Sequence, residues 1–317
     1  MQNIPILGDG LPSSLLDLLP QHYRVISFEE ASREPPADDI RQIQGIVCYG
    51  HPTVDGSLLD RLPQVKVVSN HGVGVDHIDV AAARLRDVAV GNTPGCLDAS
   101  TADMTMALIL SIARNVVSGD TYARSPEFLH YDPSILIGQE VTGSTLGIIG
   151  MGRIGEKVAE RAAGFDMRIL YHNRHRKPEC EQRLGVTYAE RDELLSASDF
   201  VSLNCPLTPE TTGLIGAREF AQMQRSAILI NMARGPVVDS TALYDALQSG
   251  TITAAAIDVT EPEPLPRDDP LLRLPNLIIT PHLGSASNRT RQRMMDMTID
   301  NLNAGIAGGP LPFPVGS

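Results

Sequence analysis

Short, apolar, β-branched runs alternate with stretches of helical spacing along the whole chain, and this alternation limits the possible folds more than any other feature. Strands that alternate with helices form right-handed β-α-β units, which build parallel sheets covered by helices. Eleven such runs are too many for one sheet of this kind, so we predict two sheets, of five and six strands. The predicted strands are residues 4–7, 24–26, 45–47, 66–69, 88–90, 146–149, 167–171, 200–203, 227–230, 254–257 and 277–279.

Two polar, turn-rich junctions indicate domain boundaries. Asn92-Thr93-Pro94-Gly95 ends one predicted strand and precedes residues 98–117, which favour a helix. His282-Leu283-Gly284-Ser285 precedes an amphipathic stretch, residues 288–304, which also favours a helix. A chain of 317 residues is long enough for two domains, each with its own core. The pattern alone therefore predicts an α/β protein with two doubly wound parallel sheets.

Charge, apolar runs and cysteine spacing argue against several classes of function. The formal net charge of -12 disfavours nucleic acid as the main ligand. The longest near-continuous apolar run, residues 104–113, is far shorter than the roughly 20 residues that span a bilayer, and the first residues do not resemble a secretory signal. Four widely spaced cysteines without a C-x-x-C pair favour free thiols over disulfides or a metal site. We expect a cytoplasmic protein with no membrane, nucleic-acid or metal partner.

The glycine motif Gly150-x-Gly152-x-x-Gly155 predicts a dinucleotide site. The motif follows an apolar strand and precedes a predicted helix, residues 156–163, which is the context that such a site requires. Gly150 permits a tight turn, Gly152 allows a pyrophosphate to approach the backbone, and Gly155 allows the helix to pack closely on the strand. The helix N-terminus then offers free N–H groups to the phosphates. The alternative is a glycine turn without a ligand.

The end of the next strand indicates which dinucleotide is bound. An NAD site usually has an acidic residue here, but this chain has the neutral Asn173 followed by Arg174 and Arg176. A carboxylate would repel a 2′-phosphate by about 4 kcal/mol at contact, at an effective dielectric constant near 20. Asn173 removes that repulsion, and both arginines can pair with the phosphate. We therefore predict that NADP(H) is preferred and NAD(H) possible, the alternative being an ordinary solvated basic segment.

Three further polar segments each follow a predicted strand, and they carry Arg234, Glu263 and His282. Ligands bind at the carboxyl ends of the strands in open parallel sheets. Arginine suits a substrate carboxylate and its carbonyl, and histidine suits proton transfer because its ordinary pKa lies near working pH. A carboxylate on the far side of the imidazole fixes its tautomer and favours the charged form. Alone, each residue is more readily a surface or structural group, but together they indicate a catalytic set for a 2-keto acid.

These residues resemble those of the D-2-hydroxy-acid dehydrogenase family, and the likeness extends from Val73-Gly74-Val75-Asp76 to the last predicted helix. Within that family the chain is most similar to glyoxylate/hydroxypyruvate reductases and 2-ketogluconate reductases, which commonly prefer NADPH. The resemblance implies a flavodoxin-like substrate domain (residues 1–97 with 286–317) and a Rossmann NAD(P)-binding domain (residues 98–285), with the last helix returning to the first domain. It also implies a homodimer joined through residues 98–140.

The resemblance further implies a role for individual residues. Substrate would contact Val73, Gly74, Arg234, His282 and Ser285. The cofactor would contact the glycine loop and the strand ends around it, at Gly150, Gly152, Arg153, Ile154, Gly155, Asn173, Arg174, His175, Arg176, Lys177, Pro206, Met232, Asp258 and Gly284. One departure concerns a tryptophan that many of these reductases carry in the dimer arm: this chain has none, and Phe128-Leu129-His130-Tyr131 occupies the region. Selectivity attributed to that aromatic side chain is therefore in doubt.

The predicted function is NADPH-preferring reduction of small 2-keto acids to D-2-hydroxy acids, with glyoxylate, hydroxypyruvate and 2-ketogluconate as candidate substrates. Two alternatives stay open: an NAD(H)-preferring D-2-hydroxy-acid dehydrogenase, and a regulatory protein that senses dinucleotides. A formate dehydrogenase is disfavoured because the family pattern then calls for glutamine at the position of Glu263.

Overall fold

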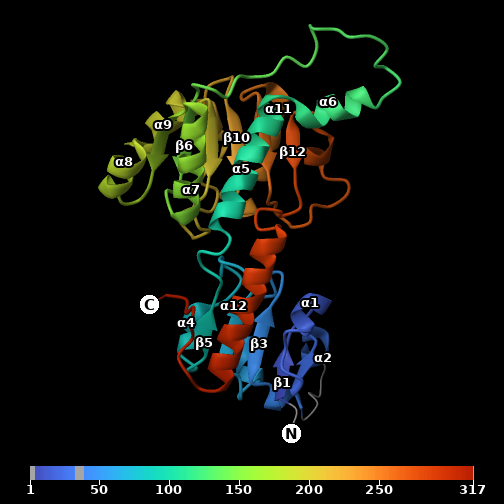
Figure 1. Ribbon diagram of the computed structural model, residues 1–317, viewed down its shortest axis with the longest axis vertical. Coiled ribbons are helices and arrows are strands. Elements are labelled where there is room, and N and C mark those ends of the chain that lie inside the picture. Colours follow the sequence, from blue (N-terminus) through green and yellow to red (C-terminus); the bar gives the residue numbers. More distant parts are fainter. Residues whose placement is uncertain (1–3, 33–38, 317) are drawn as a thin grey trace. The chain divides into compact units, whose positions relative to one another are not determined.

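The computed structural model describes residues 4–32 and 39–316, and it divides into two compact units (Figure 1). The N-terminal unit comprises Met1–Leu97 and Ser287–Ser317, and the central unit comprises Asp98–Ala286. Each unit contains one wholly parallel sheet, as the alternating pattern predicts. The α/β fold class with two doubly wound sheets is therefore confirmed.

The sheet of the N-terminal unit has the strand order β2-β1-β3-β4-β5, the flavodoxin-like order. Its core strands are buried because helices cover both faces, and such strands read as continuous apolar runs. The elements of this unit are β1 (Ile4–Leu7), α1 (Ser13–Leu16), β2 (Tyr23–Ile26), α2 (Phe28–Ser32), η1 (Ile40–Gln42), β3 (Gly45–Cys48), α3 (Gly56–Arg61), β4 (Val67–Asn70), α4 (Val80–Arg84), β5 (Ala89–Gly91) and α12 (Asn288–Ile306).

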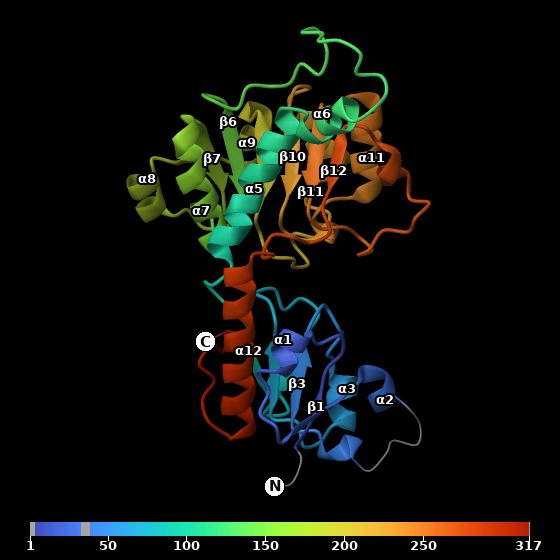
Figure 2. The ribbon, with the colours of Figure 1, turned by 45° about the vertical axis from the view of Figure 1, so that its right-hand side comes forward.

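Helix α12 packs on one face of this sheet, although about 190 residues separate it from β5. Both views show it running alongside β3 (Figures 1 and 2). The close approach requires glycine, since a Cβ at Gly305 would lie 2.4 Å from the side chain of Val67. Apolar side chains of α12, among them Ile299 and Leu302, fill the contact, and each buried side chain contributes about 1.5–3 kcal/mol. The chain thus returns to its first sheet through an apolar helix face.

The sheet of the central unit has the order β12-β11-β10-β9-β6-β7-β8, with the order reversing between β6 and β9. Ligands bind at such a switch point in doubly wound sheets. The elements are α5 (Asp98–Ala113), α6 (Val116–Ala123), β6 (Thr145–Ile149), α7 (Arg153–Ala162), η2 (Ala163–Phe165), β7 (Arg168–His172), α8 (Pro178–Leu184), β8 (Thr187–Tyr188), α9 (Arg191–Ala197), β9 (Phe200–Leu203), α10 (Ala217–Gln222), β10 (Ile228–Asn231), η3 (Gly235–Val237), α11 (Ser240–Ser249), β11 (Ala254–Ile257), η4 (Pro270–Arg273) and β12 (Leu277–Ile279).

Two details of the predicted elements are wrong. The central sheet has seven strands rather than six, because Thr187–Tyr188 pairs with the end of β7 as an edge strand too short to show a pattern. The predicted helix 98–117 is two helices, since Asn115 adopts a left-handed conformation (φ 52°) that ends α5 and starts α6 in a new direction. Among the described residues, no helix is long and apolar enough to cross a membrane.

Candidate active site

Six strand ends of the central sheet meet at one edge, and most of the predicted site residues follow them. The register aligns the last residues of these strands in order: His172, Ile149, Leu203, Asn231, Ile257 and Ile279. Arg234, Glu263 and His282 lie in the loops after β10, β11 and β12, three neighbouring strands. The parallel topology therefore gathers these loops at one edge of the sheet.

The loop that carries Arg234 is shaped by a buried amide. Asn231 is 1% exposed, and its side chain accepts a hydrogen bond from the Ala233 N–H (3.0 Å) and donates one to the Arg234 carbonyl (2.9 Å). The next residue, Gly235, packs against the following loop so closely that a Cβ there would lie 2.1 Å from the Thr260 carbonyl oxygen. The loops after β10 and β11 are thus held in direct contact, with the guanidinium of Arg234 partly exposed.

His282 and Glu263 form a direct pair. Nδ1 of His282 lies 2.7 Å from Oε1 of Glu263, and both side chains are about one third exposed (32% and 33%). A carboxylate at Nδ1 places a proton on that nitrogen and directs Nε2 away from the pair. The arrangement can hold an imidazole in one orientation, ready to exchange a proton at Nε2 with a bound molecule.

Asp258 holds the His282 loop in an unusual backbone conformation. Its buried carboxylate accepts hydrogen bonds from the N–H of Leu283 (2.7 Å), the N–H of Gly284 (2.7 Å) and the hydroxyl of Thr280 (2.5 Å). His282 has φ 56°, a left-handed conformation that costs a non-glycine residue about 1–2 kcal/mol. Such a conformation persists only where its surroundings fix it. Asp258 therefore positions His282, a role that sequence reasoning missed although a polar residue directly after a buried strand signals one.

The glycine loop has the geometry that a dinucleotide pyrophosphate needs. Gly150 has φ +100°, and a Cβ there would lie 2.5 Å from the Cys205 backbone nitrogen. A Cβ at Gly155 would lie 2.3 Å from the Gly150 carbonyl oxygen, whereas a Cβ at Gly152 would meet no atom within 4 Å. Gly152 is thus the glycine that leaves open space, and it caps α7 without a side chain over its first N–H groups. Arg153 and Ile154 begin that helix, so the residues present fit the cofactor.

Asn173 braces this loop. Its Oδ1 accepts a hydrogen bond of 2.6 Å from the Met151 N–H, and its Nδ2 donates to the Met151 carbonyl at 3.4 Å. The neutral residue at the end of β7 therefore also has a structural role. Asn173 connects that strand end to the turn between Gly150 and Gly152.

The basic residues after β7 differ in their surroundings. Arg176 forks onto Glu181 with two hydrogen bonds of 2.7 Å, and Lys177 pairs with Glu156 at 3.1 Å. Glu181 already accepts hydrogen bonds from two nitrogens of Arg176, so the pairing of Arg176 with a phosphate stays a prediction that requires these bonds to be displaced. Arg174 and His175 are exposed at the strand end. The hydrogen bonds from Arg176, and then from the Tyr171 hydroxyl (2.7 Å), lower the pKa of Glu181 to about 2.

The other predicted cofactor residues lie around the same edge. Pro206 is exposed in the loop after β9, and Met232 is buried directly after β10. Gly284 approaches Met232 closely, since a Cβ there would lie 3.2 Å from the Met232 methyl group, and Ser285 is half-buried beside it. Burial raises the pKa of the nearby Cys205 thiol to about 11, so this thiol stays protonated and is a poor nucleophile.

The predicted substrate residues Val73 and Gly74 lie in the N-terminal unit, in the loop after β4. Buried Asn70 donates hydrogen bonds to the carbonyls of Gly72 (3.0 Å) and Gly74 (2.8 Å), and Asn92 donates to the carbonyl of Val73 (2.8 Å). These contacts fix the loop through its carbonyl oxygens. Sequence reasoning missed both asparagines, although each ends or directly follows a predicted strand.

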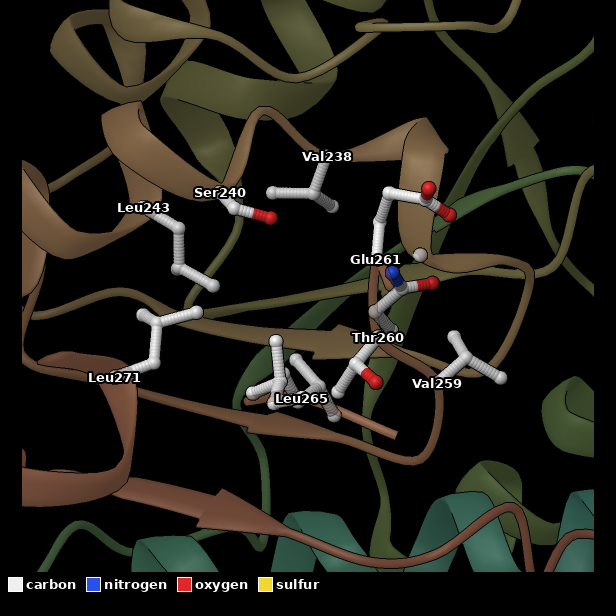
Figure 3. Close-up of a pocket in the computed structure, with 11 residues that line it drawn as sticks. Val238, Ser240, Leu243, Val259, Thr260, Glu261, Leu265 and Leu271 are labelled. Carbon is white, nitrogen blue, oxygen red and sulfur yellow. The ribbon is translucent and has the colours of Figure 1, made fainter. Parts of the chain in front are cut away.

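A small pocket lies behind the loop that carries Glu263 (Figure 3). Aliphatic side chains make up much of its border, with Leu243 and Leu271 on the left and Leu265 below (Figure 3). Its lining includes none of Arg234, Glu263 and His282. The pocket is therefore packing space beneath the loops at this edge.

A glycine loop at the switch point of a parallel sheet, beside a histidine–carboxylate pair at neighbouring strand ends, defines a class: the dinucleotide-dependent oxidoreductases. The family model "D-isomer specific 2-hydroxyacid dehydrogenase, NAD binding domain" matches residues 106–284. This protein belongs to the D-isomer specific 2-hydroxyacid dehydrogenase family and is an NAD(P)-dependent oxidoreductase.

Relatives with similar sequences and structures are reductases of small acids. The chain is 44% identical over 307 residues to glyoxylate/hydroxypyruvate reductase B of Citrobacter koseri, covering 96% of this chain and 94% of that protein. It is 42% identical over 300 residues to glyoxylate reductase of Korarchaeum cryptofilum, covering 93% and 90%. The crystal structure of an NADPH-dependent glyoxylate/hydroxypyruvate reductase from Sinorhizobium meliloti, in complex with NADP and malonate, superimposes with a TM-score of 0.90 at 32% identity, covering 99% and 97%.

Proposed function

We propose that this protein reduces small 2-keto acids, glyoxylate and hydroxypyruvate foremost and 2-ketogluconate as a further candidate, to D-2-hydroxy acids, with NADPH as the preferred cofactor. The observation that carries the proposal is the 2.7 Å contact between His282 and Glu263 at the sheet edge that also bears the glycine loop. Relatives at 42–44% identity are glyoxylate and glyoxylate/hydroxypyruvate reductases, which supports the substrate class.

In this mechanism the catalytic residues orient the substrate and supply a proton. Arg234 binds the substrate carboxylate and carbonyl through its planar fork. When bound, the nicotinamide dinucleotide supplies a hydride to the carbonyl carbon. Protonated His282 donates its Nε2 proton to the carbonyl oxygen, which yields the hydroxyl group, and Arg234 balances the negative charge that develops there. Glu263 keeps the imidazole oriented through its contact with Nδ1.

The preference for NADPH rests on the end of β7. Asn173 places no negative charge near the adenosine ribose, and the exposed Arg174 can pair with a 2′-phosphate. An NADPH-dependent reductase from Sinorhizobium meliloti shares the fold at a TM-score of 0.90, which supports this choice.

The homodimer is likewise a proposal, supported by apolar side chains on the segment after α6. Leu129, Tyr131 and Ile137 are 83%, 81% and 78% exposed, and both views show this green segment extending away from the central sheet (Figures 1 and 2). Several large apolar side chains exposed on one short segment support an interface there. The four cysteines are free thiols, which supports the cytoplasm as the compartment.

The first test is steady-state oxidation of NADPH and of NADH with glyoxylate, hydroxypyruvate and 2-ketogluconate as acceptors. We expect turnover with NADPH to exceed turnover with NADH. Preference for NADH would leave the reductase proposal intact but refute the phosphate assignment. Cofactor binding without turnover of any acceptor would favour a regulatory dinucleotide sensor.

A further inference from the structure

We propose that Glu181 sets the degree of cofactor selectivity by holding Arg176 away from the 2′-phosphate, so that Arg174 alone receives that group. The inference rests on the proposed preference for NADPH and names a positioning residue outside the predicted site. It concerns the loop between β7 and α8, where the chain carries four basic residues in a row: Arg174, His175, Arg176 and Lys177.

Glu181 holds Arg176 through a bidentate ion pair. Nε and Nη2 of Arg176 each donate a 2.7 Å hydrogen bond to a different carboxylate oxygen, and the guanidinium also lies over the ring of Tyr188 at 5.9 Å. The Glu181 side chain is only 17% exposed, against 62% for Arg176. Exposed ion pairs usually contribute little to stability. A bidentate pair with a mostly buried carboxylate is stronger, because both hydrogen bonds are charge-assisted and the carboxylate is held in place.

The buried Tyr171 holds Glu181 in place through a hydrogen bond. Its hydroxyl donates a 2.7 Å hydrogen bond to Oε1 of Glu181 and accepts one of 2.8 Å from the Lys177 N–H. The Tyr171 side chain is fully buried in the core of the central unit, so it ties α8 and the loop to the sheet. The carboxylate is therefore a rigid acceptor and does not follow the arginine toward a ligand.

The charge balance of the loop follows from these contacts. Glu181 neutralises Arg176, and Glu156 neutralises Lys177. A 2′-phosphate that recruited Arg176 would first have to displace two charge-assisted hydrogen bonds. Arg174 is left as the arginine that can meet the phosphate without that cost. Arg176 is two residues away, within about 7 Å along the backbone, so it could reach the same group if released.

The test compares Glu181→Gln, Arg176→Gln and the double variant with wild type. Calorimetric titration with 2′,5′-ADP and with 5′-AMP gives a selectivity ratio for the 2′-phosphate, and the kcat/KM ratio for NADPH over NADH gives a second one. Removing the negative charge of Glu181 and releasing Arg176 should raise both ratios by about three- to tenfold in E181Q, the scale of one charge interaction near a protein surface. R176Q removes one positive charge and leaves Glu181 unneutralised, so both ratios should fall by a similar factor, and the double variant should return them to near the wild-type values.

Two outcomes would overturn the inference: ratios unchanged in E181Q, or a gain that persists in the double variant. Thermal unfolding checks that α8 stays folded, and Glu181→Asp, which keeps the charge but withdraws the carboxylate from Arg176 by one methylene group, should give a smaller gain in the same direction. Arg174→Gln separates this inference from the proposed function. If R174Q abolishes the NADPH preference while E181Q changes nothing, only the role of Glu181 fails. If wild type prefers NADH and R174Q has no effect, the proposed preference itself fails.

Discussion

His282 joins two requirements at the scale of a single residue: a side chain that can exchange a proton and a backbone conformation that few residues adopt. Its φ of 56° and the three hydrogen bonds that Asp258 makes to residues 280–284 belong together, because the buried carboxylate offsets the strain of the turn. The contact with Glu263 then sets the direction of the imidazole ring. Chemistry and backbone geometry are separable by substitution at these positions.

Replacement of His282 by asparagine should remove the proton donor while retaining a side chain that tolerates positive φ. We expect kcat for glyoxylate reduction to fall by about 10²- to 10⁴-fold, the usual contribution of general acid catalysis. Fluorescence titration should show that NADPH still binds with near wild-type affinity. A kcat within threefold of wild type would mean that another group donates the proton.

Asp258→Asn tests the support beneath His282. The two oxygens of Asp258 accept hydrogen bonds from the N–H groups of Leu283 and Gly284, and in asparagine one of these oxygens becomes an NH₂ donor. We expect the free energy of unfolding, measured by urea denaturation, to fall by about 1–3 kcal/mol. The kcat should fall as well, because His282 loses its fixed position. Asp245→Asn on the exposed face of α11 is the matched control and should change stability by less than about 0.5 kcal/mol.

At the scale of elements, the turn from β6 into α7 combines two glycines with opposite demands. Gly155 lies against the backbone of Gly150, whereas Gly152 faces open space. Close packing within the turn requires glycine at position 155, whereas space for a ligand requires it at position 152. Helix α7 keeps its N-terminal N–H groups available because its capping residue has no side chain.

The variants Gly152→Ala and Gly155→Ala should therefore fail in different ways. G152A should fold like wild type, with an unchanged melting temperature, but bind NADPH at least tenfold more weakly because its methyl group enters the phosphate space. G155A should lose stability, since its Cβ would lie 2.3 Å from a carbonyl oxygen and α7 must shift. Equal melting temperatures in both variants, or unimpaired NADPH binding in G152A, would contradict this division of roles.

At the scale of the whole molecule, the exposed apolar segment after α6 indicates association. Leu129, Tyr131 and Ile137 expose large side chains near one another in the sequence, within a segment that has little regular structure of its own. A lone exposed leucine elsewhere, such as Leu85 on the N-terminal unit at 84% exposure, needs no such explanation.

Substitution of Leu129 and Ile137 by glutamate should convert a dimer into a monomer, measured by sedimentation velocity, because two buried charges cost more than the lost contacts alone. Leu85→Glu is the control and should leave the oligomeric state unchanged. A wild-type protein that sediments as a monomer at micromolar concentration would contradict the proposed homodimer.

The sequence alone determined the fold class and the predicted chemical groups, because both depend on local patterns. Alternation of β-branched runs with helical stretches predicts parallel sheets, and eleven of the twelve strands were predicted to within a few residues. The strand before the glycine motif and the helix after it predict a dinucleotide site. Arg234, Glu263 and His282 stood out because each follows a strand, where parallel topology places ligands.

Tertiary structure decided what each polar group does, because hydrogen-bond partners come from distant parts of the chain. The edge strand Thr187–Tyr188 exists only because β7 lies beside it, and Asp258 became a support for His282 through contacts 22 to 26 residues away. The sequence predicts Arg176 as a phosphate ligand, whereas in the structure its guanidinium donates two hydrogen bonds to Glu181 of α8. Charge and spacing predict which groups are present, whereas packing determines which of them are already engaged.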